Sequence, residues 1–271
     1  MSRGFSSVQA AVDAISRGEV VIVVDDEGRE NEGDFICAAE KATPENVNLI
    51  MRGRGDFCMP ILPDVCKRLD VQPLVDSNTA PLGTAFMTPL DHRLNRTGIT
   101  AEERSRTVLT IVNSQSQPED FVRPGHVHLL LAKEGGVLRR AGHTEAAVDL
   151  ARMAGLVPAG VLCEILDDEG NRATRDQLLV MAEEKNIEII TIEELIAYRR
   201  LTEKMVSRSV ETKLPTHFGD WKVIVYDVKY ESQQPVVLVR GDLDKAPQAP
   251  LVRLHSSCFT GDLLGSLRCD C

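Results

Sequence analysis

The chain has 271 residues, 43% of them hydrophobic, and a formal net charge of −10, so it can build one large domain or two unequal ones. The negative charge argues against nucleic acid and anionic membranes as partners, because the summed field repels phosphate groups at a distance. No apolar run approaches the roughly 20 residues of a membrane span, and the N-terminus lacks the apolar core of a signal peptide. The seven cysteines are an odd number, and the first four lack framework spacing, which is typical of reduced thiols in the cytoplasm.

Helices and strands alternate from the N-terminus. Apolar residues at helical spacing predict a helix over residues 5–15. Runs rich in β-branched and apolar residues predict strands at Glu19–Val24, Phe35–Ala39 and Phe57–Leu62. Thr43 followed by Pro44 is typical of a helix start, with the threonine as N-cap, and this helix is expected to end near Gly53.

An acidic stretch runs from Asp25 to Asp34, directly after the first predicted strand. It carries six carboxylates and one arginine, punctuated by Gly28 and Gly33, which permit tight turns or positive φ angles. This many negative charges in ten residues repel one another unless a cation binds among them. One interpretation is a solvated acidic loop, as for most charge runs. The other is a site for a hard divalent cation, because α/β proteins place chemistry in loops that follow strands.

Residues 76–97 are irregular and rich in Asn, Thr, Pro and Gly. A loop of this length is either disordered or functional, for example a lid over an active site. The sequence Thr100-Ala-Glu-Glu103 then has the form of a capping box and predicts a helix through about Asn113.

The alternation continues to residue 205. Strands are predicted at Val127–Ala132, Gly160–Leu166 and Ile187–Ile192, and helices at Glu145–Leu156, Arg175–Lys185 and Glu193–Lys204. This order predicts an α+β fold, a mixed sheet with surrounding helices. Glu164 is the lone acid of its strand, and either it faces outward at a sheet edge or it is buried with a partner.

The pattern changes after Val206 to polar and β-prone segments. Strands are predicted at Trp221–Val228, Val236–Arg240 and Leu251–His255. We therefore predict two domains, residues 1–205 and residues 206–271, of which the second is small, mainly β and cut off in mid-fold.

The segment Arg140-Ala-Gly-His143-Thr144-Glu145 leads into a predicted helix. Backbone N–H groups at a helix N-terminus, beside an arginine and a threonine hydroxyl, form a favourable phosphate site. His143 could complete a metal site begun by the acidic stretch. The plainer interpretation is a helix-capping threonine beside an exposed histidine.

Four motifs, in this order, resemble 3,4-dihydroxy-2-butanone 4-phosphate synthase of riboflavin biosynthesis. They are Asp25–Asp34, Arg123-Pro-Gly-His126, Gly135–Glu145 and Pro158–Glu164, and the resemblance covers about residues 1–200. Members of that family split D-ribulose 5-phosphate into formate and a four-carbon dihydroxybutanone phosphate. They use Mg²⁺ or Mn²⁺ and form homodimers whose active sites lie at the subunit interface.

The resemblance also implies roles for single residues. Glu30 and His143 correspond to metal ligands, and Glu32, His126 and Glu164 to the acid/base set. Substrate contacts correspond to Arg29, Asp34, Cys58, Thr107, Arg140, Ala141, Gly142 and Thr144. These groups would move protons through enediol formation, loss of water, skeletal rearrangement and hydration with release of formate. The chain departs from the family after Val127, where an aromatic residue and a proline are usual and His128-Leu129-Leu130 stands instead, which affects local packing more than activity.

The tail resembles the start of GTP cyclohydrolase II, which is often fused behind the synthase. The resemblance rests on Arg253–Asp262 and Gly265–Cys271. Zinc in that family is held by three thiolates at this spacing, to which Cys258, Cys269 and Cys271 correspond. Ser257 stands where that family has glutamate, and the region supplying its catalytic tyrosine, aspartate and arginine does not follow Cys271, so we do not expect GTP hydrolysis.

Two alternatives stay open at this point. The chain could be a noncatalytic regulatory or assembly subunit that keeps the synthase fold. It could also be a truncated form of a bifunctional enzyme that has GTP cyclohydrolase II activity as well. The intact metal-binding and acid/base residues favour an active synthase over the first alternative.

Overall fold

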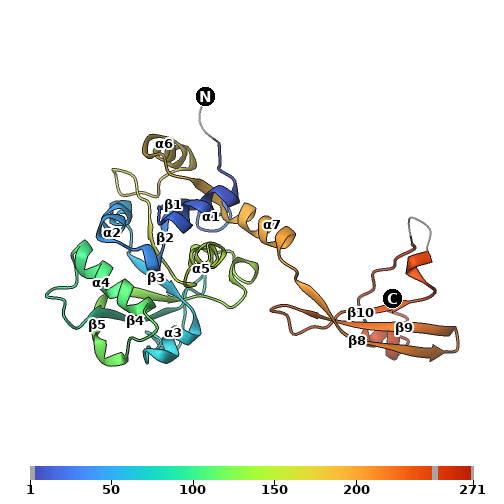
Figure 1. Cartoon of the computed structure of the whole chain (residues 1–271). Helices are drawn as coiled ribbons and strands as arrows, with labels where there is room; N and C mark the ends of the chain where they lie inside the picture. The colour runs from blue at the N-terminus through green and yellow to red at the C-terminus, as the bar shows by residue number, and fades with distance from the viewer. Residues whose placement is uncertain (1–3, 246–249, 270–271) are drawn as a thin grey trace. The chain divides into compact units, whose positions relative to one another are not determined.

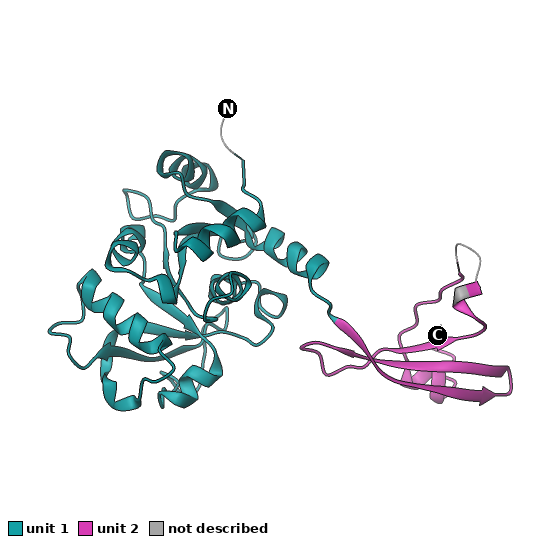
Figure 2. Cartoon of the chain, viewed as in Figure 1, with its two compact units in different colours: residues 1–205 teal, residues 206–271 magenta. Residues whose placement is uncertain are grey.

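The computed structural model describes residues 4–245 and 250–269 of the chain. The chain divides into two compact units, Met1–Met205 and Val206–Cys271 (Figure 2). Among the described residues, no helix combines the length and the apolar character needed to cross a membrane.

The first unit is built on a seven-stranded sheet. Its strands are β1 (Val21–Val24), β2 (Gly33–Ala38), β3 (Cys58–Ile61), β4 (Phe86–His92), β5 (Phe121–Leu131), β6 (Gly160–Glu164) and β7 (Ile189–Thr191). They lie in the order β4-β5-β3-β6-β2-β1-β7 (Figure 1). β1 is parallel to β7 and β3 is parallel to β5, whereas the other neighbours are antiparallel. This mixed sheet confirms the predicted fold class.

Helices cover both faces of the sheet (Figure 1). One face carries α1 (Val8–Arg17), α5 (His143–Met153) and α7 (Ile192–Thr202). The other carries α2 (Pro44–Ile50), α3 (Pro63–Arg68), α4 (Ala101–Val112) and α6 (Arg175–Lys185). Val21 and Val23 of β1 pack under the first group, and Ile22 and Val24 under the second. A strand covered on both faces has a continuous apolar sequence, as β1 does.

Side-chain caps place several helix starts where the sequence predicts them. Thr43 Oγ1 accepts a hydrogen bond from the Asn46 N–H at the start of α2. Thr100 and Glu103 form the predicted capping box of α4. Glu103 also accepts the N–H groups of Thr97 and Arg96, and these bonds lower its pKa to about 2.

The second unit contains a three-stranded antiparallel sheet. Its strands are β8 (Val206–Thr216), β9 (Gly219–Val228) and β10 (Val236–Val239), in the order β10-β9-β8. Ile224 is its buried hydrophobic side chain among the described residues. The second unit is therefore mainly β, as predicted, and most of its apolar side chains face solvent.

Several segments differ from the prediction, among them α3 (Pro63–Arg68), which was not predicted, and β5, which begins at Phe121 and not at Val127. The irregular segment at 76–97 contains β4, whose strand pattern is hidden by Pro89 and by register shifts between Met87 and Asp91. The strand predicted at Leu251–His255 is not formed in the described part of the tail. β8 gives no sequence signal because its residues are exposed on both faces and lack an alternating pattern.

A buried ion pair joins α5 to α7. Arg199 Nη1 lies 2.6 Å from Asp149 Oδ2 and donates to the Gly135 carbonyl at 2.8 Å. Neither side chain reaches solvent. Asp149 Oδ2 also accepts the Val137 N–H at 2.8 Å. The pair therefore fixes the turn at residues 135–137, which leads into the N-terminal end of α5.

Replacing Arg199 by methionine should lower the free energy of unfolding by about 3 kcal/mol, because the buried Asp149 would keep only the partly exposed Arg152 as a counterion. Urea unfolding followed by circular dichroism measures the change. Arg17→Met is the matched control, since Arg17 pairs with Glu19 at the surface, where such a pair contributes about 0–1 kcal/mol. Equal stability of the two variants would contradict this account.

Candidate active site

Chain segments far apart in the sequence meet at one end of the sheet. The acidic stretch follows the end of β1 and precedes β2, β6 ends there at Glu164, and α5 begins there at His143. Asp34 and Glu164 are direct partners across the antiparallel pair β2 and β6. Partners of this kind lie on the same face of a sheet. Ile36 and Leu162 lie two positions further along the same strands, on the same face, and pack beneath α5. Both carboxylates therefore belong to the face that carries His143.

Asp25 organises the acidic stretch from within. Its buried carboxylate accepts the N–H groups of Glu30 and Glu32, at 3.2 and 2.9 Å, and pairs with Arg29 at 2.8 Å. The loop is therefore a folded turn around an internal anion and not a solvated acidic loop. Sequence reasoning gave Asp25 no role of its own, although its place directly after a buried strand is a usable signal.

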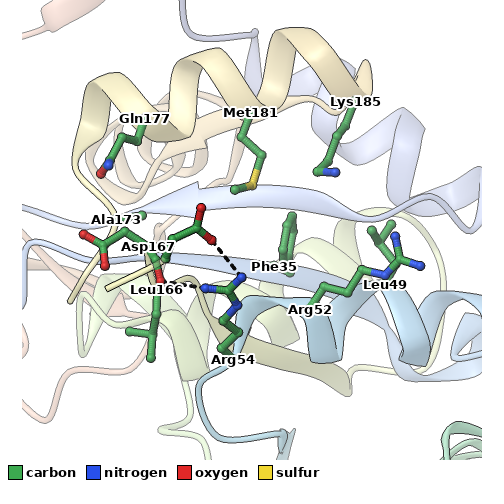
Figure 3. A pocket seen from close by; sticks show the side chains of 11 residues that line it. Phe35, Leu49, Arg52, Arg54, Leu166, Asp167, Ala173, Gln177, Met181 and Lys185 are labelled. Carbon is green, nitrogen blue, oxygen red and sulfur yellow. Dashed lines mark hydrogen bonds and ion pairs between the residues drawn. The ribbon is translucent and has the colours of Figure 1, made fainter. Parts of the chain in front are cut away.

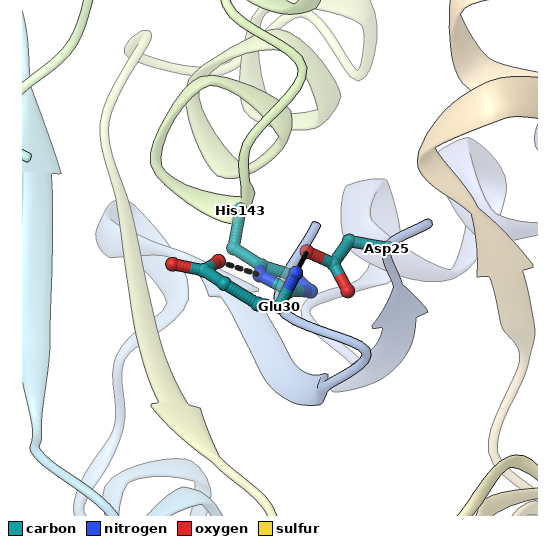
Figure 4. Close-up of side chains that lie close together, drawn as sticks. All are labelled: Asp25, Glu30 and His143. Carbon is teal, nitrogen blue, oxygen red and sulfur yellow. Dashed lines mark hydrogen bonds and ion pairs between the residues drawn. The ribbon is translucent and has the colours of Figure 1, made fainter. Parts of the chain in front are cut away.

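The His143 imidazole faces the acidic stretch (Figure 4). It is buried, and its Nδ1 lies 3.8 Å from Glu30 Oε2 and 3.8 Å from Asp34 Oδ1. On the far side of the ring, Nε2 lies 3.1 Å from the Val23 carbonyl and donates to it. This bond leaves Nδ1 as the atom directed at the carboxylates. The alternative of a capping threonine beside an exposed histidine is wrong, because Gly142 is the N-cap and His143 is buried.

The pKa values of His143, Asp34 and Glu30 reflect an excess of negative charge in this cluster, which favours binding of a cation. Burial alone lowers the pKa of His143, but Asp34, Glu30 and Asp25 outweigh burial and raise it to about 9. Burial raises the pKa of Asp34 to about 8, and Asp34 Oδ1 is buried without a hydrogen-bond partner. The nearby His143 imidazole and the charge of Arg29 lower the pKa of Glu30.

A divalent ion fits this donor set. Oxygen and nitrogen atoms of Asp25, Glu30 and His143 lie within 4.8 Å of one another, and the orphaned oxygen of Asp34 faces the same imidazole nitrogen. Carboxylate oxygens with one imidazole suit Mg²⁺ or Mn²⁺. The structure brings the predicted ligand pair Glu30 and His143 to within 3.8 Å of each other, and Asp25 and Asp34 are further candidates, so the ligand roles stay predictions.

Glu164 lies between the cluster and the start of β3. β6 is an interior strand between β3 and β2, so Glu164 does not face outward at a sheet edge. Its Oε2 accepts the Asp56 N–H at 2.7 Å, and a Cβ on Gly55 would lie only 2.3 Å from that oxygen. Burial raises the pKa of Glu164. Burial, together with the charges of Glu30 and Glu164, also raises the pKa of Glu32.

Two arginines converge on the N-terminal end of α5. A Cβ on Gly142 would lie 2.5 Å from the Arg140 guanidinium and 3.0 Å from that of Arg29. Thr144 is buried in the first turn of the helix, whose N-terminal N–H groups carry partial positive charge. Glycine at this position therefore lets both guanidinium groups lie against the N-terminal end of the helix. Ala141 directly precedes Gly142, the N-cap of this helix.

Arg140 also holds part of the segment predicted as a lid. Its guanidinium donates to Thr84 Oγ1 at 2.9 Å and to the Leu82 carbonyl at 3.3 Å, and it pairs with the buried Glu145 at 2.7 Å. The exposed loop before β4 is thus tethered to the site by a residue predicted to bind phosphate.

His126 lies in β5 beside a hollow of about 280 Å³ that Gly55, Asp56 and Arg104 also line. Its Nδ1 is 2.6 Å from the buried Asp91, which also accepts the His126 N–H at 3.1 Å. The pair with Asp91 leaves Nε2 as the ring nitrogen available to a ligand. Because the Asp56 N–H binds Glu164, the hollow adjoins both candidate proton carriers. The role of Asp91 has no signal in a single sequence.

The weaker candidates are buried. Thr107 Oγ1 accepts from the His92 N–H and the Asn95 amide and donates to the Glu103 carbonyl, so it shapes residues 92–95. Cys58 begins β3 in the core beneath α5, and burial raises the pKa of its thiol. The departure at His128-Leu129-Leu130 continues β5 in register with β3, where a proline would remove a ladder hydrogen bond. The substrate-binding roles of Thr107 and Cys58 stay predictions.

The tail brings two of its cysteines together. Cys258 Sγ and Cys269 Sγ are 3.3 Å apart, and the Gly261 N–H donates to Cys258 Sγ at 3.3 Å. This spacing is compatible with two thiolates sharing one ion. Cys271, the third predicted ligand, lies outside the described residues.

Known protein families match both units. Residues 9–198 match the model of 3,4-dihydroxy-2-butanone 4-phosphate synthase, and residues 207–271 match that of GTP cyclohydrolase II. The riboflavin biosynthesis protein RibBA of Bacillus subtilis (strain 168) is 48% identical over 268 residues, 98% of this chain and 67% of that protein. RibBA of Bacillus mycoides (strain KBAB4) is 50% identical over the same lengths.

Solved structures agree with these matches. RibBX of A. baumannii, a two-domain 3,4-dihydroxy-2-butanone 4-phosphate synthase, is 38% identical with a TM-score of 0.81 over 89% of this chain and 72% of that one. A 3,4-dihydroxy-2-butanone 4-phosphate synthase in complex with two magnesium ions is 37% identical with a TM-score of 0.68, over 73% of this chain and 98% of that one.

Replacing Asp25 by alanine should accelerate amide hydrogen exchange at Glu30 and Glu32 by at least about tenfold, because both N–H groups lose their acceptor. Exchange of peptides spanning residues 26–33, read by mass spectrometry, measures the effect. Asp26→Ala is the matched control, since Asp26 is exposed and accepts the N–H of Gly28. Similar exchange of residues 30–32 in both variants would refute the role of Asp25.

Without a cation, the protein should lose stability between pH 6.5 and pH 9. With a folded-state pKa of about 9 for His143 and about 8 for Asp34, the folded state binds more protons than the unfolded chain in this range, so stability falls as the pH rises. Thermal unfolding midpoints of EDTA-treated protein measure the slope. His143→Gln should flatten it and His217→Gln, in the second unit, should not. A midpoint that rises with pH would show that the cluster does not hold these protons.

Proposed function

The chain belongs to the 3,4-dihydroxy-2-butanone 4-phosphate synthase family, and we propose that Glu30, Asp34 and His143 mark the place where it converts D-ribulose 5-phosphate. The products are 3,4-dihydroxy-2-butanone 4-phosphate and formate, which makes the chain a carbon–carbon lyase of riboflavin biosynthesis. One observation carries the assignment of the site. A buried imidazole faces two carboxylates, one of which has an orphaned oxygen.

Glu30 and His143 would hold a divalent ion, Mg²⁺ or Mn²⁺, with Asp25 or Asp34 as a further contact. A related synthase has been solved with two magnesium ions, and the donors here suit the same kind of ion. When bound, the ion supplies Lewis acidity that makes a carbon-bound proton of a hydroxyketone removable. Asp25 keeps Glu30 in place through the backbone bonds described above, and the Val23 carbonyl keeps His143 oriented.

Glu32, Glu164 and His126 would carry the protons. Burial raises the pKa of Glu164 and of Glu32, so each can hold a proton nearer neutrality and return it to the substrate. His126 is held by Asp91 with one ring nitrogen directed away from that carboxylate. Several proton transfers in one reaction need several such groups, and the chain places them around the same end of the sheet.

Arg140, Arg29 and Thr144 would bind the phosphate of the substrate, and Gly142 lets the two guanidinium groups lie beside the helix N-terminus. Arg140 also contacts the loop at Leu82 and Thr84, so a phosphate on Arg140 and closure of that loop are linked. A closed loop would keep water from the reactive intermediates.

We propose further that two copies of the chain form a dimer with the active sites at the interface. Exposed large hydrophobic side chains lie on or beside β4 and β5, the pair at one edge of the sheet: Leu74, Leu94, Ile99 and Val122. His126 belongs to β5 and is about half exposed, at 49%. A partner that covers this edge would bury these side chains and approach His126.

The reduced cysteines of the first unit suit a cytoplasmic location.

The second unit would bind zinc through Cys258, Cys269 and Cys271. The close approach of Cys258 and Cys269 and the family match support this proposal.

A purely noncatalytic role for the chain is disfavoured, because such a role does not require Glu30, Asp34 and His143 to converge in the first unit.

Alanine at Glu30 or at His143 should lower formate release from D-ribulose 5-phosphate by at least about a thousandfold, since loss of the ion removes several kcal/mol of transition-state stabilisation. A coupled formate assay with Mg²⁺ measures turnover. Glu27→Ala is the matched control, because Glu27 belongs to the same stretch but is 74% exposed and pairs with Arg175. Equal turnover of all variants and the parent chain would refute the assigned site.

A further inference from the structure

A second hollow lies on the face of the sheet opposite His143. Its volume is about 290 Å³, and it opens between α6 and the short 3₁₀ helix η2 (Met51–Gly53) over Phe35 of β2 (Figure 3). Phe35 packs in the core beneath α2 and α6, whereas its neighbour Asp34 faces the other way. The hollow is therefore separated from the cluster at His143 by the sheet itself.

The hollow combines an apolar floor with a basic rim. Phe35, Leu49 and Met181 form the floor, and Gln177 faces it from the same side of α6 as Met181. The rim carries three cations, Arg52, Arg54 and Lys185, and two carboxylates, Asp167 and Asp168. An apolar hollow with a few convergent polar groups is the usual form of a small-molecule site.

The basic rim is only partly neutralised. Arg54 donates to the Asp167 carbonyl at 2.9 Å and pairs with the exposed Asp168 at 2.8 Å. The Asp167 carboxylate is used by the backbone of its own turn. Within residues 4–245 and 250–269, neither Arg52 nor Lys185 has an ion-pair partner. In a chain of net charge −10, such a local excess of cations favours an anionic ligand.

The residues on either side of Arg54 contact Glu164. Arg54 has a positive φ of 72° and lies between two glycines that touch the end of β6. A Cβ on Gly53 would lie 2.5 Å from the Glu164 carbonyl, and one on Gly55 would lie 2.3 Å from Glu164 Oε2. The Gly55 N–H donates to the Glu164 carbonyl at 3.2 Å. The backbone on either side of Arg54 therefore contacts Glu164 directly, and a ligand that moves this segment would also move its contacts with Glu164.

We propose that this hollow binds a small molecule with a flat apolar ring and a phosphate, and that its occupation lowers turnover through Arg54. The ring would lie against Leu49 and Met181, since thioethers favour aromatic contacts and Phe35 beneath them is only 1% exposed. The phosphate would contact Arg52, Arg54 and Lys185. The effect on turnover rests on the proposed role of Glu164, whereas binding does not.

Phenyl phosphate is the minimal probe, and calorimetric titration of the EDTA-treated chain tests binding. We expect saturable binding that persists when excess D-ribulose 5-phosphate fills the candidate active site. Inorganic phosphate, which has no ring, and phenol, which has no charge, should each bind at least about tenfold more weakly. Absence of saturable binding, displacement by D-ribulose 5-phosphate, or equal affinity for inorganic phosphate would each overturn the proposal.

Variants locate the site. Arg52→Gln and Lys185→Gln should each weaken phenyl phosphate binding by about fivefold. Lys67→Gln should not change it, although Lys67 occupies the last turn of α3 as Lys185 occupies the last turn of α6. An equal loss in Lys67→Gln would show a general charge effect and overturn the assignment.

A formate assay tests the link to turnover. Saturating phenyl phosphate should lower kcat by about fivefold at an unchanged KM for D-ribulose 5-phosphate. Arg54→Gly, which keeps the backbone free to adopt positive φ, should abolish this inhibition. A raised KM would place the probe in the active site, and an unchanged kcat would overturn the link. If the parent chain releases no formate, the proposed function fails while the titration still decides the hollow.

Discussion

The main constraint on the first unit is the repulsion among carboxylates at one end of its sheet, which other groups must offset. The pairing of β2 with β6 sets Asp34 directly opposite Glu164, and the loop after β1 brings Glu30 and Glu32 to the same place. Like charges opposite each other in a sheet are destabilising. The fold offsets them with a buried imidazole, raised carboxyl pKa values and a place for a cation. These same features are what proton-transfer chemistry requires, so the local cost in stability and the catalytic capacity have one origin.

Glycine residues make this crowding possible. Gly55 lets Glu164 approach the chain at Asp56, and Gly142 lets two guanidinium groups approach the first turn of α5. A Cβ would occupy the space of the Glu164 carboxylate at Gly55 and the space of the guanidinium groups at Gly142. The buried pair of Asp149 and Arg199 then fixes the turn before α5. The position of His143 is thus determined by contacts on both sides of it, from Val23 and from the helix that follows.

Local signals in the sequence predicted much of this architecture. Thr43 and Thr100 start helices because their hydroxyls accept hydrogen bonds within the first turn, a property that needs no distant partner. The proximity of Glu30 and His143 followed from a family resemblance across several motifs, since no local pattern links residues more than a hundred positions apart. Asp91 and Arg199 could not be found in this way, because their partners His126 and Asp149 are set by tertiary packing. β4 escaped notice because Pro89 and its bulges remove the period of two on which strand prediction depends.

The register of β2 against β6 has a consequence for folding fidelity. A slip of β2 by a single residue would turn Asp34 into the apolar layer beneath α2 and α6 and would bring Phe35 to the side of His143. Such a misaligned strand would bury the Asp34 carboxylate away from the imidazole that it faces in the native sheet. Asp34 therefore penalises this misalignment, so a residue that faces the imidazole also helps to fix the register of β2.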